Sequence, residues 1–170
     1  MSRSLTTVIV LTAALAVSAC SKKRPEDLPP PPGPVQGQSE LDNRGSSIVP
    51  GSQADFVQQM AGQDVIYFDT DRFNIDNIDA AALQSQAQWL KRYPNKRATI
   101  EGHADERGTR EYNLALGERR ANAAKNYLQS LGIDASRLTT VSYGKERPKA
   151  LGSNEEAWAQ NRRAVTITID

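Results

Sequence analysis

The sequence predicts an α+β domain in which helices cover one face of a mixed sheet. Patterns typical of strands and helices alternate from residue 64 onward, in the order β-α-β-α-β-(α)-β. The last predicted strand, "RRAVTITID", alternates Val165, Ile167 and Ile169 with small or polar side chains, which is typical of a sheet with one face in water. The domain spans roughly 105 residues, enough for one modest hydrophobic core.

The first half of this domain is predicted to contain two strands and a helix. The segment "DVIYF" is rich in β-branched and aromatic residues and therefore predicts a strand. In "DNIDAAALQSQAQWLKRYP", apolar residues at helical spacing predict a helix that Pro94 ends. Those residues are Ala80, Leu83, Ala87 and Leu90. The alternating segment "RATIEGH" predicts the second strand, which ends at His103.

The second half is predicted to begin with a long helix. The segment "REYNLALGERRANAAKNYLQSLG" has helical periodicity, and Gly132 closes it. Small residues recur on the face that we expect to pack on the sheet, namely Gly117, Ala121 and Ala124, followed by Leu128. The segment "RLTTVSYG" predicts the third strand, and "NEEAWAQ" predicts a short helix before the last one.

The first 19 residues are predicted to be a lipoprotein signal peptide. Arg3 precedes "TTVIVLTAALAVSA", an apolar run of roughly 14 residues, whereas a membrane span needs about 20. The run ends in "AVSAC", which resembles the lipobox of bacterial lipoproteins and implies that Cys20 becomes the acylated first residue. Ser21, in place of an aspartate, implies an anchor in the outer membrane with the domain facing the periplasm. The alternative is an ordinary cleavage site with an incidental cysteine.

Residues 20–62 are predicted to form the lipidated cysteine and a flexible tether, and residues 63–170 the folded domain. The tether contains "PPPPGP", a composition typical of an extended or disordered linker. At its end, "GSQADFVQQMAG" carries the signals of a short leading helix, with Ser52 as its cap and Gly62 as its stop.

Charge and cysteine content limit the possible functions. The chain has 21 Lys and Arg against 20 Asp and Glu, so no bulk attraction to nucleic acid is expected. Cys20 is the only cysteine, which excludes an internal disulfide. Any binding must therefore come from a local arrangement of side chains.

The segment "EGHADERG" places several ionisable side chains between a predicted strand and the long helix. Loops in this position often carry binding groups, and the helix start offers backbone N–H groups to an anion. In "ERRA", Arg119 is predicted to be solvated, whereas Arg120 lies at the border of the sheet-facing side and can aim its guanidinium at the loop. Asp105 and Arg120 are therefore predicted to flank one pocket with opposite charges.

The residue types in this loop are compatible with acid–base catalysis, metal binding or recognition of a charged ligand. A catalytic or metal-binding set would consist of His103, Asp105 and Glu106. Hydrolysis normally needs a base with a nucleophile or a metal, and zinc catalysis usually takes three protein ligands with histidine prominent. Since His103 is the only histidine in the chain, the sequence favours a binding protein without a cofactor or metal over an enzyme.

Four stretches resemble the C-terminal domain of outer-membrane protein A (OmpA): "VIYFDTDRFNID", "EGHADERGTREYNLALGERRA", "VSYGKERP" and "NRRAV". The resemblance covers essentially all of residues 64 to 169 and implies non-covalent binding of peptidoglycan through the meso-diaminopimelate of its stem peptide. It implies that Asp105 meets the ligand's ammonium and Arg120 its carboxylate, and that Thr70, Asp71, Arg107 and Leu116 line the pocket. Replacing Asp105 or Arg120 with alanine is then expected to abolish binding and leave the fold intact.

Lipid-anchored members of this family link the outer membrane to the cell wall. They also pair with the periplasmic protein TolB of the Tol system, so the resemblance implies TolB and peptidoglycan as partners. A protein–protein adaptor with secondary wall binding is the alternative. Trp158 is expected to be a packing residue, and Arg162 and Arg163 are expected to brace the sheet without a role in the site.

Overall fold

The structure is a computed structural model, and it describes residues 48–169. The predicted signal peptide of residues 1–19, Cys20 and the tether up to residue 47 lie outside the described residues. Among the helices of residues 48–169, none combines the length and the apolar character needed to cross a membrane.

The predicted order of strands and helices is confirmed. In chain order the elements are α1 (Gln53–Met60), β1 (Val65–Tyr67), α2 (Asn77–Arg92), β2 (Arg97–His103), α3 (Arg110–Ser130), the 3-10 turn η1 (Ala135–Arg137), β3 (Leu138–Gly144), α4 (Glu155–Asn161) and β4 (Arg163–Ile169). The η1 turn is the element that sequence periodicity did not predict. Three residues are too few to carry a periodic signal.

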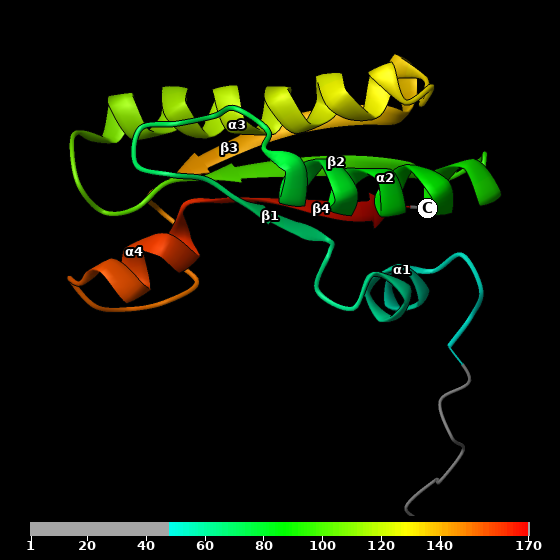
Figure 1. Ribbon diagram of the computed structural model, residues 1–170, viewed down its shortest axis with the longest axis horizontal. Helices are drawn as coiled ribbons and strands as arrows, with labels where there is room; N and C mark the ends of the chain where they lie inside the picture. The colour runs from blue at the N-terminus through cyan, green and yellow to red at the C-terminus, as the bar shows by residue number, and fades with distance from the viewer. Residues whose placement is uncertain (1–47, 170) are drawn as a thin grey trace, which may run out of the picture. The chain divides into compact units, whose positions relative to one another are not determined.

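The four strands form one mixed sheet in the order β1-β4-β2-β3. Strand β4 runs antiparallel to both β1 and β2, whereas β2 and β3 are parallel. Helix α3 packs along β2 and β3, and α2 lies beside it (Figure 1). This arrangement confirms the predicted α+β fold, with helices over one face of a mixed sheet.

Strand β4 turns its smaller side chains toward the helices. Ala164, Thr166 and Thr168 are buried, whereas Ile167 on the opposite side is half-buried. The threonines are tolerated inside because they are hydrogen-bonded; for example, the Thr166 hydroxyl donates to Gln86 Oε1 at 2.7 Å. Their small volume lets the helices approach the sheet. Alternation alone predicted the strand but not which face is covered.

Helix α1 begins as predicted and ends slightly earlier. The Ser52 hydroxyl accepts a hydrogen bond from the Asp55 N–H at 3.2 Å, which caps the helix start. The helix ends at Met60, and its C-cap Ala61 takes the left-handed conformation at φ 49°. Gly62 follows at φ 95°, so two residues share the turn.

The same helix packs on the core, so the packed part of the chain begins before residue 63, inside the predicted tether. Phe56 is fully buried and Met60 is 5% exposed. The Trp89 indole N–H donates to Asp55 Oδ2 at 3.0 Å and joins α1 to α2. A proline-rich composition marked the tether, but it could not show that α1 has a partner surface.

We expect a chain that starts at residue 64 to be less stable than one that starts at residue 48. Removing α1 exposes the surface that covers Phe56 and Met60. Burial of two such side chains contributes about 3 to 6 kcal/mol to the free energy of unfolding. Urea denaturation of both chains measures the difference, and equal unfolding free energies would contradict the packing role of α1.

Two glycines bring α3 into direct backbone contact with β2. A Cβ atom on Gly102 would lie 1.8 Å from the carbonyl oxygen of Gly117, and one on Gly117 would lie 2.4 Å from Ser142 Oγ. Only glycine permits this approach. The contact holds the first half of α3 over the C-terminal end of β2, where the "EGHADERG" loop lies.

Candidate functional site

The site is a pocket of about 240 Å³ lined by residues of the β1–α2 loop, the β2–α3 loop and the start of α3. Figure 1 shows both loops at the end of the sheet where α3 begins. All six residues predicted for ligand binding line the pocket: Thr70, Asp71, Asp105, Arg107, Leu116 and Arg120. The pocket also contacts Gly108, Tyr112 and Asn113, which sequence reasoning missed. Helical spacing could have found Tyr112, because Tyr112, Leu116 and Arg120 recur every four residues on α3.

Arg120 projects from α3 toward the two loops and is fully buried, whereas Arg119 is exposed as predicted. The Arg120 guanidinium donates three hydrogen bonds to backbone carbonyls. Nε bonds the Arg72 carbonyl at 2.9 Å, Nη1 the His103 carbonyl at 2.8 Å, and Nη2 the Asp69 carbonyl at 3.0 Å. A guanidinium has five N–H donors, so these bonds leave two for a ligand carboxylate. Burial lowers the pKa of Arg120 to about 10, and the side chain stays protonated at neutral pH.

Asp105 supplies the negative charge of the pocket and is 7% exposed. Arg107 binds both of its carboxylate oxygens, from Nε to Oδ1 at 3.1 Å and from Nη2 to Oδ2 at 2.7 Å. Burial alone would raise the pKa of Asp105, but the hydrogen bonds and charge of Arg107, together with the charge of Arg162, outweigh burial and lower it. The carboxylate is therefore ionised at neutral pH.

Arg107 connects the two loops at the mouth of the pocket. Its side chain is 39% exposed and also donates from Nη2 to Thr70 Oγ1 at 3.2 Å. The guanidinium lies 4.2 Å from the centre of the Trp158 ring, a cation–π contact. Trp158 was predicted to be a packing residue, but it is only half-buried and its indole N–H donates to Glu106 Oε1 at 3.0 Å. It supports the loop that carries Asp105.

The remaining pocket walls come from the β1–α2 loop and the first turns of α3. Asp71 has a left-handed backbone at φ 56° and accepts a hydrogen bond from the Tyr112 hydroxyl at 3.2 Å. Leu116 is 5% exposed and supplies an apolar surface. The Asn113 side chain donates to the Arg107 carbonyl at 2.8 Å and fixes the loop to α3.

The three residues considered for catalysis or metal binding do not converge. His103 is buried, its ring lies 5.6 Å from that of Tyr143, and it does not line the pocket. Burial and the charges of two nearby arginines lower the pKa of His103 to about 4, so the ring is neutral at neutral pH. Glu106 accepts a hydrogen bond from the Trp158 indole and does not line the pocket. Within residues 48–169, no group of three or more His, Cys, Asp or Glu side chains could hold a metal ion.

Comparison with known proteins identifies the family. Residues 67–162 match the OmpA family. The chain is 51% identical over 160 residues to the peptidoglycan-associated lipoprotein of Agrobacterium fabrum, a match that covers 94% of this chain and 85% of the relative. The crystal structure of the peptidoglycan-associated lipoprotein from Burkholderia pseudomallei superposes with a TM-score of 0.60 at 47% identity and covers 62% of this chain and 89% of that one.

A more distant structure shows the same fold. The C-terminal domain of Helicobacter pylori MotB superposes with a TM-score of 0.58 at 18% identity, and the match covers 62% of this chain and 84% of the MotB domain. The match to the OmpA family and the high identity to the peptidoglycan-associated lipoproteins establish the family of this chain. The chain belongs to the OmpA family and, within it, to the peptidoglycan-associated lipoproteins.

Proposed function

We propose that this protein binds peptidoglycan non-covalently through the meso-diaminopimelate of the stem peptide. Asp105 meets the ligand's ammonium and Arg120 its carboxylate. Thr70, Asp71, Arg107 and Leu116 line the remaining walls of the pocket. The names of its close relatives support association with peptidoglycan.

One observation carries the proposal: a buried carboxylate and a buried guanidinium line the same small pocket. Asp105 is 7% exposed and Arg120 is fully buried. The free end of the diaminopimelate side chain carries an ammonium and a carboxylate on one carbon, so its recognition needs an anion and a cation at a fixed separation. Exposed ion pairs contribute about 0.2–1 kcal/mol, whereas desolvated interfacial pairs couple by roughly 1.5–7 kcal/mol. Because both groups are buried, we expect their ion pairs with the ligand to have the coupling energies of desolvated interfacial pairs.

When the ligand's ammonium binds Asp105, the Arg107 guanidinium moves off the Asp105 carboxylate. In the free protein its Nη2 occupies Asp105 Oδ2 at 2.7 Å. Its side chain is partly exposed, and Thr70 Oγ1 and the Trp158 ring remain as partners when it leaves this contact. Arg107 can then line the rim while the ligand binds Asp105.

We propose that a lipid anchor at Cys20 and the tether that follows it attach the binding domain to the outer membrane. Acylation of Cys20 fixes the chain in the inner leaflet of the outer membrane, and the tether spans the distance to the wall. The protein thus links the outer membrane to peptidoglycan, as part of the Tol–Pal system in envelope integrity and cell division, with TolB as a protein partner. Its role is to bind peptidoglycan and keep it attached to the outer membrane, with no enzymatic step and no cofactor.

A comparison of two stem peptides tests the proposal directly. We expect the full chain to bind a tripeptide that ends in meso-diaminopimelate at least about tenfold more tightly than the same peptide with lysine, because lysine keeps the ammonium and lacks the carboxylate that Arg120 holds. Calorimetric titration measures both affinities. Equal affinities for the two peptides would overturn the assignment of Arg120.

A further inference from the structure

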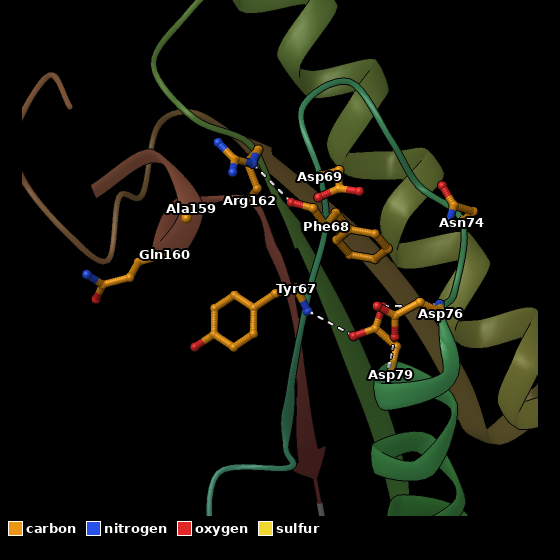
Figure 2. Close-up of a pocket in the computed structure, with 9 residues that line it drawn as sticks. All are labelled: Tyr67, Phe68, Asp69, Asn74, Asp76, Asp79, Ala159, Gln160 and Arg162. Atoms are coloured by element: carbon orange, nitrogen blue, oxygen red, sulfur yellow. Dashed lines mark hydrogen bonds between the residues drawn. The ribbon is translucent and has the colours of Figure 1, made fainter. Parts of the chain in front are cut away.

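Arg162 lies at the junction of α4 and β4, and sequence reasoning assigned it no role in the site. It is 6% exposed and makes three contacts in different directions. Its Nε donates to the Phe68 carbonyl at 3.0 Å, and its Nη2 contacts Glu155 Oε1 at 2.6 Å. Its Nη1 lies 3.5 Å from Asp105 Oδ2. Figure 2 shows the bond to Phe68 at the edge of a second cavity, of about 400 Å³, that Arg162 also lines.

We propose that Arg162 is a positioning residue that sets the place of Asp105 relative to Arg120. It touches the carboxylate that meets the ligand and the loop that holds the guanidinium, without lining the ligand pocket itself. This inference rests on the proposed function, since it concerns the same bound amino acid.

The two arginines on the Asp105 carboxylate differ in burial. Arg107 is 39% exposed at the pocket mouth, whereas the Arg162 side chain is 7% exposed. Within residues 48–169, Arg162 Nη1 is a buried nitrogen without a hydrogen-bond partner, and the Asp105 carboxylate is its charged neighbour. When the ligand's ammonium displaces Arg107, Arg162 remains and keeps the carboxylate in place. A small rotation of Asp105 would turn the 3.5 Å contact into a hydrogen bond.

The bond to Phe68 extends this control to the other half of the site. Phe68 begins the β1–α2 loop, whose Asp69 and Arg72 carbonyls both accept hydrogen bonds from Arg120. Arg162 therefore fixes the start of the β1–α2 loop at Phe68, and Arg120 fixes the following residues at Asp69 and Arg72. Through this chain of bonds one buried side chain determines the separation of the two charges that recognise the ligand.

The neighbouring Arg163 provides a matched control. It belongs to the same "NRRAV" segment and is 8% exposed. Its guanidinium donates to the Asn161 and Arg147 carbonyls at 3.4 and 3.2 Å. Within residues 48–169, no hydrogen bond or ion pair joins it to Asp105. Replacement of either arginine removes a buried cation that donates to a backbone carbonyl, so loss of that bracing is common to both variants. Arg162 also pairs with the exposed Glu155, a contact that Arg163 lacks.

The test compares Arg162→Gln with Arg163→Gln in the full chain. We expect Arg162→Gln to weaken binding of the diaminopimelate tripeptide by roughly tenfold or more, and Arg163→Gln to keep it within about twofold. Calorimetry gives the affinities, and thermal melts confirm that each variant is folded at the temperature used.

The pH dependence of tripeptide binding separates the positioning role from a purely structural one, because a purely structural role of Arg162 would not change the pH at which binding is lost. Five charged side chains surround the Asp105 carboxylate: Arg107 and Glu106 on its own loop, Arg120 from α3, Arg162 at the end of α4 and Asp71 from the β1–α2 loop. Binding is lost on acidification as Asp105 becomes protonated. Removing the positive charge of Arg162 raises the Asp105 pKa, so binding should fail at a higher pH in Arg162→Gln and at the wild-type pH in Arg163→Gln.

Carbon-13 NMR of the Asp105 carboxyl in the ligand-free variants checks that pKa directly. If the wild type does not bind the tripeptide, the proposed function fails. If the wild type binds and Arg162→Gln binds equally well, or loses no more than Arg163→Gln, the positioning role is wrong and the proposed function stands.

Discussion

Replacing Asp105 with asparagine is expected to abolish measurable binding to peptidoglycan while the domain remains folded. Asparagine has the same shape and keeps an oxygen at Oδ1, which accepts two bonds from Arg107. It lacks the charge that meets the ligand's ammonium. Loss of one partner of a buried charge pair costs about 2–5 kcal/mol, which is about thirtyfold or more in affinity. Sedimentation with purified peptidoglycan and calorimetry with the tripeptide measure this loss.

Glu118→Gln is the matched control for this experiment. Glu118 is an exposed acid on α3 outside the pocket, so its replacement changes the net charge equally without touching the site. We expect the control to bind like the wild type. Retention of binding by Asp105→Asn would exclude Asp105 as the ammonium partner.

Replacing Arg120 with alanine is expected to remove both ligand binding and a large part of the stability. The sequence suggested that the fold would remain intact, but the structure shows three carbonyls that depend on this guanidinium, those of Arg72, His103 and Asp69. Unsatisfied buried acceptors cost about 1–3 kcal/mol each, and removal of a buried charged partner costs about 3–5 kcal/mol. We therefore expect the unfolding free energy to fall by about 3 to 5 kcal/mol.

Chemical denaturation of Arg120→Ala and Arg119→Ala measures this effect on adjacent residues of one helix. Arg119 is exposed, with its guanidinium 5.9 Å from the centre of the Phe73 ring, so its loss should change stability by no more than about 0.5 kcal/mol. Equal stability of the two variants would contradict the buried role of Arg120. Because Arg120→Ala affects folding as well as binding, Asp105→Asn is the cleaner test of recognition.

The strands and helices could be predicted because their signals are local. Alternation marked β2 and β4, and helical spacing marked the face of α3 that packs on the sheet. The inward face of β4 could not be predicted, because it depends on distant partners such as Gln86 for Thr166. The packing of α1 on the core depends in the same way on surfaces that lie elsewhere in the sequence.

Most of the residues that line the candidate pocket could be predicted, but not the hydrogen bonds that hold them. The resemblance placed six residues together, and the structure brings all six to one pocket. The carbonyl partners of Arg120 lie 17, 48 and 51 residues away in the chain, and no local pattern encodes them. Arg162 was assigned to the sheet for the same reason, since its contact with Asp105 joins positions 57 residues apart.

The most direct test of the account is a crystal structure of the protein bound to a stem tripeptide that ends in meso-diaminopimelate. We predict that the ligand's free ammonium lies within hydrogen-bonding distance of Asp105 and its carboxylate on the two remaining donors of Arg120. Arg162 should stay on Asp105 while Arg107 moves aside. A peptide bound in the cavity between Tyr67 and Arg162, or bound without contact to Asp105 and Arg120, would contradict the account.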